Sequence, residues 1–243
     1  MKVAVVGKGG SGKTTTSAVL ARTLSRRGVR TIALDCDTNP NLGLSLGIGE
    51  DASLDLIAVR QAVDDGQEEH AADFTDLVER FGVDAPDGVR LAVVNAIANP
   101  RPGCPCCGVS PERLLDELDM ADGVVIADFE AGLGTVIRMG DRPVDVVVVV
   151  AEPTAKSMEV ARRAVDLIEQ NRLGRVVIAA NRVRDDDDLA RLRAAFHSHD
   201  IVVIPDDPEI GNAERAGSSP LDSAPLTAGV QALIRLAESV VPA

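Results

Sequence analysis

The chain has 243 residues, 45% of them hydrophobic, and a formal net charge of −13 at pH 7. This length and apolar content suit a single α/β domain, residues 1–243, with a large core. The negative charge and the lack of Trp and Tyr argue against nucleic acid as a partner. No apolar run reaches transmembrane length and no signal-peptide pattern precedes the first strand, so we expect a cytoplasmic protein without a membrane partner.

Short β-branched runs alternate with helical patterns along the chain. The predicted strands span residues 2–6, 30–34, 89–94, 123–127, 144–150, 175–179 and 201–204. The predicted helices span residues 12–27, 53–63, 70–81, 111–119, 154–170, 186–196 and 227–240. Several strands are nearly continuous Val and Ile, which is typical of parallel strands covered on both faces. The pattern predicts a doubly wound α/β fold with a mainly parallel sheet of seven or eight strands and helices on both faces.

Two charged clusters lie on the predicted helices. Arg22, Arg26 and Arg27 share one helix, with Arg30 just beyond, and we interpret them as a solvated helix face, with a local basic patch as the alternative. The acidic run 185–188 is interpreted as the first turn of a helix, where negative charge complements the helix dipole.

A glycine-rich segment after the first strand carries the most specific motif of the chain. Residues 7–14 match the phosphate-loop pattern G-x-x-x-x-G-K-[ST], which ends in Gly12, Lys13 and Thr14. Glycines let backbone N–H groups turn inward and bind a β-phosphate. Lys13 is placed to reach the β- and γ-phosphates, and the Thr14 hydroxyl to bind Mg²⁺. An ordinary glycine-rich turn is the alternative, but the strand–loop–helix setting favours a nucleoside triphosphate site.

Three later segments should meet this loop, because ligands bind beyond the carboxyl ends of the strands in such folds. Asp37 follows the second strand, where an aspartate can hold Mg²⁺-bound water or the attacking water, or can simply form a turn. Asp128 ends an apolar strand, which is the usual position of the carboxylate behind Mg²⁺. Asn181 follows the sixth strand, and its amide can read an adenine edge or cap the strand end.

Together these segments resemble the MinD/ParA/nitrogenase-iron-protein group of deviant phosphate-loop ATPases. The resemblance extends from Lys2 to about Asp222. It implies a homodimer in which Lys8 crosses to the partner's nucleotide, and in which ATP closes the dimer before slow hydrolysis. The implied catalytic residues are Lys8, Lys13 and Asp37, and Thr14 and Asp37 would hold Mg²⁺. The implied nucleotide-binding residues are Gly9, Gly10, Ser11, Gly12, Lys13, Thr14, Thr15, Asp128, Asn181 and Pro205.

Three of the four cysteines lie within Cys104-Pro105-Cys106-Cys107. In a reducing compartment such clustering indicates metal or redox chemistry before disulfides, and thiolates bind Zn²⁺, Cu⁺ and iron–sulfur clusters. Cys104 with either Cys106 or Cys107 fills half of a four-thiolate site, which a twofold dimer would complete. Adventitious surface thiols or a labile local disulfide are the alternative. Cys36 stands alone and is interpreted as buried packing.

Within the ATPase group, Cys104-Pro105-Cys106 resembles the Cys-x-Cys motif of the nickel-insertion accessory ATPases of carbon monoxide dehydrogenase, the CooC type. The segment from Asp128 to Leu133 also resembles the second switch of that family. The resemblance implies that Cys104 and Cys106 bind Ni²⁺ or Zn²⁺, that ATP and Mg²⁺ are cofactors, and that a client metalloenzyme is the partner. An iron–sulfur cluster carrier using Cys104 and Cys107 stays open, as does a ParA/MinD-like partitioning ATPase, which the acidic charge disfavours.

Overall fold

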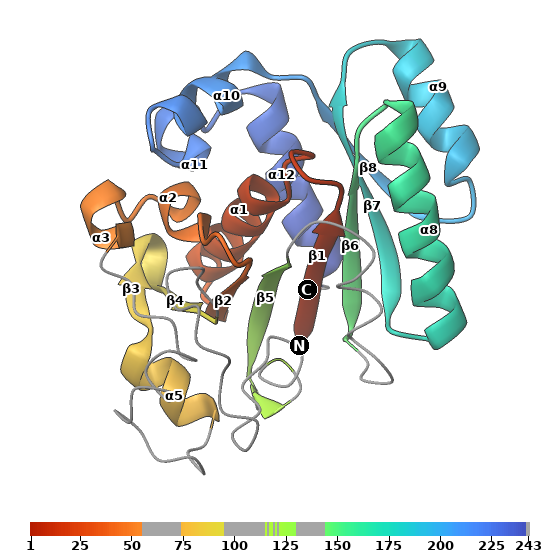
Figure 1. The fold of residues 1–243 in the computed structure, drawn as a ribbon. Helices are drawn as coiled ribbons and strands as arrows, with labels where there is room; N and C mark the ends of the chain where they lie inside the picture. Colours follow the sequence, from red (N-terminus) through yellow and green to blue (C-terminus); the bar gives the residue numbers. More distant parts are fainter. Residues whose placement is uncertain are drawn as a thin grey trace.

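The computed structural model describes residues 1–54, 74–94, 115, 117, 118, 120, 122–129 and 144–241. These residues contain an eight-stranded sheet with the strand order β3-β4-β2-β5-β1-β6-β7-β8 (Figure 1). All described pairings are parallel except that of β3 with β4, which confirms the predicted mainly parallel sheet. The strands are β1 (Lys2–Gly7), β2 (Arg30–Cys36), β3 (Val83–Ala85), β4 (Val89–Val93), β5 (Gly123–Phe129), β6 (Val146–Ala151), β7 (Arg175–Val183) and β8 (Asp200–Pro205).

The described helices include three short ones that the sequence pattern does not predict, α2, α10 and α11. The predicted helix 53–63 begins earlier, at Glu50, and its residues after Leu54 lie outside the described part. Most of the predicted helix 111–119 also lies outside the described part. No helix in the described ranges is long and apolar enough to cross a membrane. The helices are α1 (Lys13–Arg26), α2 (Leu42–Leu46), α3 (Glu50–Leu54), α5 (Phe74–Phe81), η1 (Pro86–Gly88), α8 (Ala155–Asn171), α9 (Asp186–Ala195), α10 (Pro208–Arg215), α11 (Pro220–Ser223) and α12 (Ala228–Val240).

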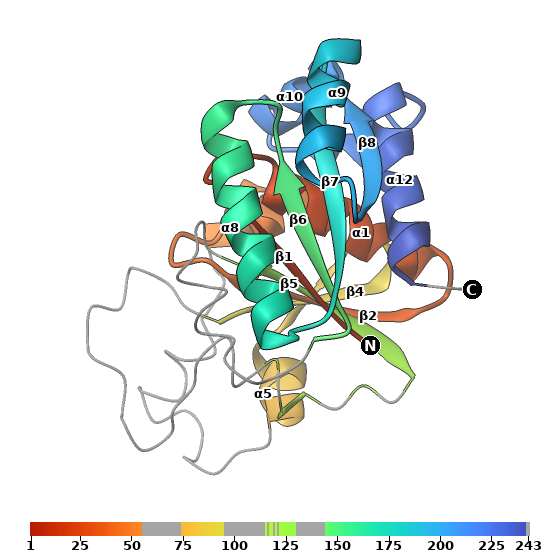
Figure 2. The same ribbon diagram turned by 90° about the vertical axis from the view of Figure 1, so that its right-hand side faces the viewer.

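Helices cover both faces of the sheet, as Figure 2 shows. Successive side chains of a strand point to opposite faces, so β1 contributes to two separate cores. Val3 and Val5 pack with residues of α1 and α12, whereas Ala4 and Val6 pack with residues of α5, α8 and α9. All four side chains are at most 1% exposed. This arrangement confirms the doubly wound fold.

The loop after β1 lies at the point where the connections of the sheet diverge. From β1 the chain crosses through α1 to β2, on the β5 side, whereas β6, β7 and β8 lie on the other side of β1. In an open α/β sheet the ligand crevice forms at such a switch point, beyond the carboxyl ends of the strands. The fold therefore places residues 8–12 where a ligand is expected.

One member of the arginine cluster, Arg22, is buried, whereas Arg26, Arg27 and Arg30 are exposed as expected. Arg22 is 2% exposed, and its guanidinium bonds to Asp87 Oδ2 at 2.6 Å and to the two carboxylate oxygens of Asp222 at 2.6 and 2.7 Å. Its Nη1 also donates to the Leu46 carbonyl at 3.1 Å. Arg22 therefore ties α1 to α2, η1 and α11, and the expectation of a solvated side chain is wrong at this position. The other arginines also pair with carboxylates, as Arg26–Asp87, Arg27–Glu238 and Arg30–Glu79.

Replacing Arg22 should weaken the whole domain. Arg22→Met removes the shared donor of Asp87, Asp222 and the Leu46 carbonyl, so we expect the free energy of unfolding to fall by about 2–3 kcal/mol. Arg163→Met is the matched control, because Arg163 is 62% exposed and pairs with Glu159 on its own helix. The control should change the free energy by less than about 0.5 kcal/mol. Chemical denaturation without nucleotide measures the free energy of unfolding of both variants. Equal decreases in the two variants would contradict the role given to Arg22.

Candidate nucleotide-binding site

A cleft of about 420 Å³ lies against the loop after β1, the start of α1, the end of β7 and the segment that runs from β8 into α10. Lys8, Gly9 and Ser11 belong to the same loop, while Asp37 follows β2 and Asp128 lies near the end of β5. Residues of α10 that sequence reasoning missed, among them Ile210, Glu214 and Arg215, form one wall of the cleft. The predicted residues that line the cleft are Gly10, Gly12, Lys13, Thr14, Thr15, Asn181 and Pro205.

Glycine is required at two positions of the loop by the strands beside it. Gly12 has φ +96, and a Cβ there would lie 2.4 Å from Asn181 Nδ2. Gly7 has φ +153, and a Cβ there would lie 2.5 Å from the Val150 carbonyl oxygen. Both glycines therefore let the backbone approach β6 and β7 more closely than any side chain allows. The result is a loop fixed against the ends of two strands.

The start of α1 forms an anion-binding site. Gly12 is the N-cap and has no side-chain oxygen to accept from the first N–H groups of the helix. Those donors and the positive end of the helix dipole favour a negatively charged ligand. Lys13 is 7% exposed and brings positive charge to the same place. Ser11 Oγ is buried without a hydrogen-bond partner within the described ranges. These features fit a bound phosphate.

Two buried carboxylates stand side by side behind the loop. Asp128 of β5 lies in register with Asp35 of β2. Burial raises the pKa of Asp128 to about 6, although hydrogen bonds from Thr14 and Ser17 and the charge of Lys13 lower it. Burial and the charge of Asp128 raise the pKa of Asp35 to about 8. At neutral pH Asp35 is therefore mostly protonated, whereas Asp128 is mostly ionised and oriented by Ser17 Oγ at 3.1 Å.

Asp35 also holds the loop that carries Asp37. Its Oδ1 accepts from the Asp37 N–H at 3.2 Å, and its Oδ2 accepts from the Leu42 N–H at 2.8 Å. Asp37 is half-buried and accepts from the Asn39 N–H at 2.9 Å. The charge of Asp37 raises the pKa of both Asp35 and Asp128, so the three carboxylates form one cluster. Sequence reasoning missed Asp35, although it ends an apolar run as Asp128 does.

The residues present fit a nucleoside triphosphate with Mg²⁺. Thr14 offers a hydroxyl, and Asp37 and Asp128 offer carboxylates, which are the hard oxygen groups that Mg²⁺ prefers, directly or through water. In the described part of the chain no group of three His, Cys, Asp or Glu residues could hold a metal. Mg²⁺ bound with a nucleotide usually keeps several waters and takes further ligands from the phosphates. When bound, Mg²⁺ neutralises charge on the β- and γ-phosphates. Lys13 would add to that, and Asp37 would orient the attacking water.

Two predicted residues bond to the loop itself. Lys8 Nζ donates to the Gly9 carbonyl at 3.1 Å, and Lys8 does not line the cleft. Its reach to a partner's nucleotide therefore stays a prediction. Asn181 Nδ2 donates to the Ser11 carbonyl at 2.7 Å, and its Oδ1 accepts from the Arg182 N–H at 3.0 Å. One N–H and one lone pair of the amide remain for a nucleobase.

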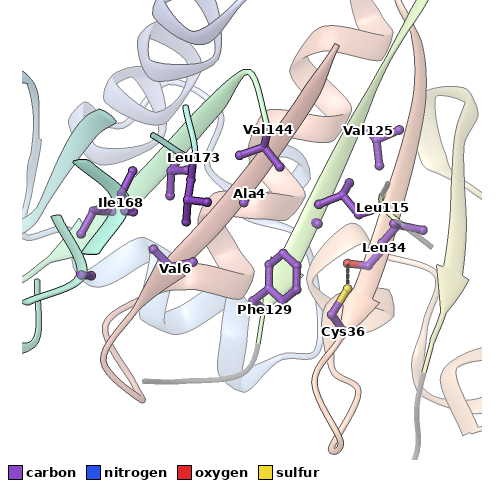
Figure 3. Packing of buried hydrophobic residues seen from close by; sticks show 14 of the residues in the cluster. Ala4, Val6, Leu34, Cys36, Leu115, Val125, Phe129, Val144, Ile168 and Leu173 are labelled. Atoms are coloured by element: carbon purple, nitrogen blue, oxygen red, sulfur yellow. Dashed lines mark hydrogen bonds between the residues drawn. The ribbon is translucent and has the colours of Figure 1, made fainter. Parts of the chain in front are cut away.

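The cysteine cluster, including Cys104 and Cys106, lies outside the described residues, as does the segment that follows Phe129. Cys36 is described and is 4% exposed within the core, which confirms its interpretation as buried packing. Cys36 and Phe129 are register partners at the ends of β2 and β5 (Figure 3). The two segments that follow Asp37 and Phe129 thus leave the sheet from neighbouring strands.

The chain matches the model of the CobQ/CobB/MinD/ParA nucleotide binding domain over residues 2–221. An uncharacterized ATP-binding protein of Methanocaldococcus jannaschii is 33% identical over 198 residues, 77% of each chain. The carbon monoxide dehydrogenase accessory protein CooC of Rhodospirillum rubrum is 29% identical over 93% of this chain and 91% of that protein. The fold is similar to that of the septum site-determining protein MinD of Pyrococcus horikoshii, complexed with Mg-ADP, with a TM-score of 0.73 and 22% identity over 98% of this chain and 95% of that one. The chain therefore belongs to the CobQ/CobB/MinD/ParA family of ATP-binding, ATP-hydrolysing phosphate-loop proteins.

Proposed function

We propose that this chain is a dimeric, Mg²⁺-dependent ATPase that carries nickel or zinc to a client metalloenzyme, such as a nickel carbon monoxide dehydrogenase. Family membership supports the ATPase activity. The observation that carries the metal function is the motif Cys104-Pro105-Cys106 in a chain that is 29% identical to CooC over almost its whole length. CooC is by name an accessory protein of carbon monoxide dehydrogenase. Cys104 and Cys106 would be the metal ligands, and Cys107 would be a third ligand or a bystander.

The connection that carries this motif along the chain begins near the nucleotide site. The cysteines lie in the connection from β4 to β5, and both of these strands pair with β2. At the carboxyl end of β4, the Val94 N–H donates to the Asp35 carbonyl at 2.9 Å. The connection therefore begins beside the carboxylate that holds the Asp37 loop. A rearrangement of that loop on ATP binding would act on Asp35 and, through its carbonyl, on Val94, where the connection begins.

A dimer would explain why two ligands per chain suffice. Soft thiolates bind Ni²⁺ and Zn²⁺, and two of them leave a four-coordinate ion half-bound. A twofold axis beside the phosphate loops, with Lys8 crossing to the partner's nucleotide, would bring two cysteine pairs together. ATP binding would close the dimer and hydrolysis would release it, so that metal transfer follows the nucleotide cycle.

The part of the chain that the structure describes offers little to a partitioning ATPase that attaches to DNA or membranes. Arg22, Arg26, Arg27 and Arg30 each pair with a carboxylate. Most of the apolar face of α12 packs in the core and is not available to a lipid surface, because Val230, Leu233 and Leu236 are at most 2% exposed. An iron–sulfur carrier would use the same cysteines, and metal analysis separates it from the nickel function.

Metal binding by cysteine variants tests the proposal. Protein prepared anaerobically is titrated with Ni²⁺ and Zn²⁺ against a chromophoric chelator. Cys104→Ala/Cys106→Ala should weaken binding by about 100-fold or more. Cys36→Ala is the matched control, since it removes a core thiol and should leave metal affinity unchanged.

Three results would contradict the nickel function. One is ATP hydrolysis without Ni²⁺ or Zn²⁺ binding, unchanged in the double cysteine variant. Another is brown protein with stoichiometric iron and sulfide, which would favour an iron–sulfur carrier. The third is ATP-dependent, salt-sensitive DNA binding, which would favour a partitioning ATPase.

A further inference from the structure

The end of β7 departs from regular strand geometry. The register of β7 with β8 shifts between Ala180 and Val183, so Asn181 and Arg182 form a bulge. Arg182 has φ +57, in the left-handed region that residues other than glycine seldom adopt. Consecutive side chains of a regular strand point to opposite faces, but a bulge re-aims them. Here the bulge lets two consecutive side chains reach the same loop.

Both side chains bond to consecutive carbonyls of the phosphate loop. Asn181 Nδ2 donates to the Ser11 carbonyl at 2.7 Å, and Arg182 Nη1 donates to the Gly10 carbonyl at 3.2 Å. A peptide unit is planar, so a fixed carbonyl also fixes the N–H on its other side. Arg182 thereby orients the Ser11 N–H, which closes the turn by donating to the Lys8 carbonyl at 3.1 Å. Asn181 orients the Gly12 N–H in the same way.

Glu152 holds the guanidinium in place. Arg182 Nη1 bonds to Glu152 Oε1 at 2.6 Å, and the Glu152 side chain is only 13% exposed. Glu152 follows β6, the strand between β1 and β7, and its own N–H donates to Ser157 Oγ at 3.0 Å. A left-handed backbone at arginine is costly and persists only where its surroundings hold it. The contacts that hold it here are those to the loop and to Glu152, together with the Arg182 N–H, which donates to Asn181 Oδ1 at 3.0 Å.

We propose that Arg182, held by Glu152, is a positioning residue that keeps the phosphate loop in its binding conformation before the nucleotide arrives. Arg182 would act through the Gly10 carbonyl and the turn from Lys8 to Ser11, with Asn181 fixing the next peptide unit. The inference concerns the ATP site alone and does not depend on the metal function. It predicts a defect in binding phosphates and no defect in binding the nucleoside.

Arg182→Gly is the informative variant, because glycine adopts φ +57 without strain. It removes the guanidinium and relieves the backbone strain, which offsets part of the lost ion pair with Glu152. The equilibrium constant of unfolding without nucleotide should therefore change by less than about fivefold, which corresponds to about 1 kcal/mol. The Kd of Mg-ADP should rise about tenfold, as expected for losing a charged hydrogen bond that orders the loop. The Kd of adenosine, which has no phosphate, should change by less than about twofold. Calorimetry measures the first and ligand-observed NMR the second.

Glu152→Gln provides an independent test that leaves the Arg182 backbone untouched. It should weaken Mg-ADP binding to a similar degree, and the double variant should be no weaker than the weaker single variant. Arg163→Gln, an exposed charge change on α8, should alter neither affinity. Mg-ADP binding within twofold of the wild type in both single variants would overturn the proposal. Equal weakening of Mg-ADP and adenosine would also overturn it, because that would indicate a general loss of the cleft.

Discussion

Gly12→Ala should abolish useful nucleotide binding, with a loss of at least about 100-fold in affinity for Mg-ADP. An alanine Cβ would lie 2.4 Å from Asn181 Nδ2, at a φ of +96 that alanine rarely adopts. Relief of that clash must move either α1 or the amide that bonds the Ser11 carbonyl. Either movement takes backbone N–H groups away from the phosphate. Isothermal calorimetry with Mg-ADP measures the loss.

Gly10→Ala is the matched control for this prediction. Gly10 also has a positive φ, +76, but a Cβ there would have nothing within 4 Å. Gly10→Ala therefore adds only backbone strain, and the affinity for Mg-ADP should fall about tenfold at most. Losses of the same size in the two variants would show that strain alone, and not the contact with Asn181, decides the effect.

Asp37→Asn should lower kcat for ATP hydrolysis by about 100-fold or more while the Kd of ATP changes by less than about threefold. An amide cannot accept the proton of the attacking water. The loop itself should keep its place, because its anchors are the Asp37 and Leu42 N–H groups bonded to Asp35. Single-turnover hydrolysis and nucleotide binding are measured on the same protein.

Asp35→Asn is the matched control, since it changes a neighbouring carboxyl in the same cluster. The pKa of Asp35 is raised to about 8 by burial and by Asp128, so this carboxyl is mostly neutral at pH 7. A neutral amide matches it in charge, but its NH2 group cannot accept one of the two N–H groups that Asp35 holds, so the Asp37 loop loses one anchor. We expect kcat to fall by about tenfold, well below the loss in Asp37→Asn. A larger loss in Asp35→Asn than in Asp37→Asn would move the hydrolytic role to Asp35.

The centre of the fold could be predicted from the sequence because several independent signals agree there. β1, its loop and α1 combine a continuous apolar run, a fixed motif and a helical period. α10 could not be predicted, because it has only eight residues and its position depends on a distant helix. Its N-cap Asp207 also accepts from the Gly229 N–H of α12 at 2.9 Å. β3 has three residues and pairs antiparallel at the sheet edge, too short for a periodic signal.

The residues whose roles sequence reasoning missed depend on contacts between distant segments. The helical pattern gives Arg22 an ordinary surface position, and its burial comes from Asp87 and Asp222, which lie 65 and 200 residues away. Arg182 follows a predicted strand, but only the bulge against β8 shows that its side chain and that of Asn181 both reach the phosphate loop. Sequence motifs identify the residues expected to contact the nucleotide. The residues that hold those motifs in place can be recognised only from the tertiary structure.

Two half-sites for one metal ion should meet only in the nucleotide-bound dimer. Native mass spectrometry of Asp37→Asn protein, prepared anaerobically with Mg-ATP and Ni²⁺, tests this directly. We predict a dimer with two nucleotides and one nickel ion, and a nucleotide-bound dimer without nickel when Cys104→Ala/Cys106→Ala is added. A monomer that binds nickel fully without nucleotide, or a nucleotide-bound Asp37→Asn dimer with intact cysteines and no nickel, would contradict the proposed function.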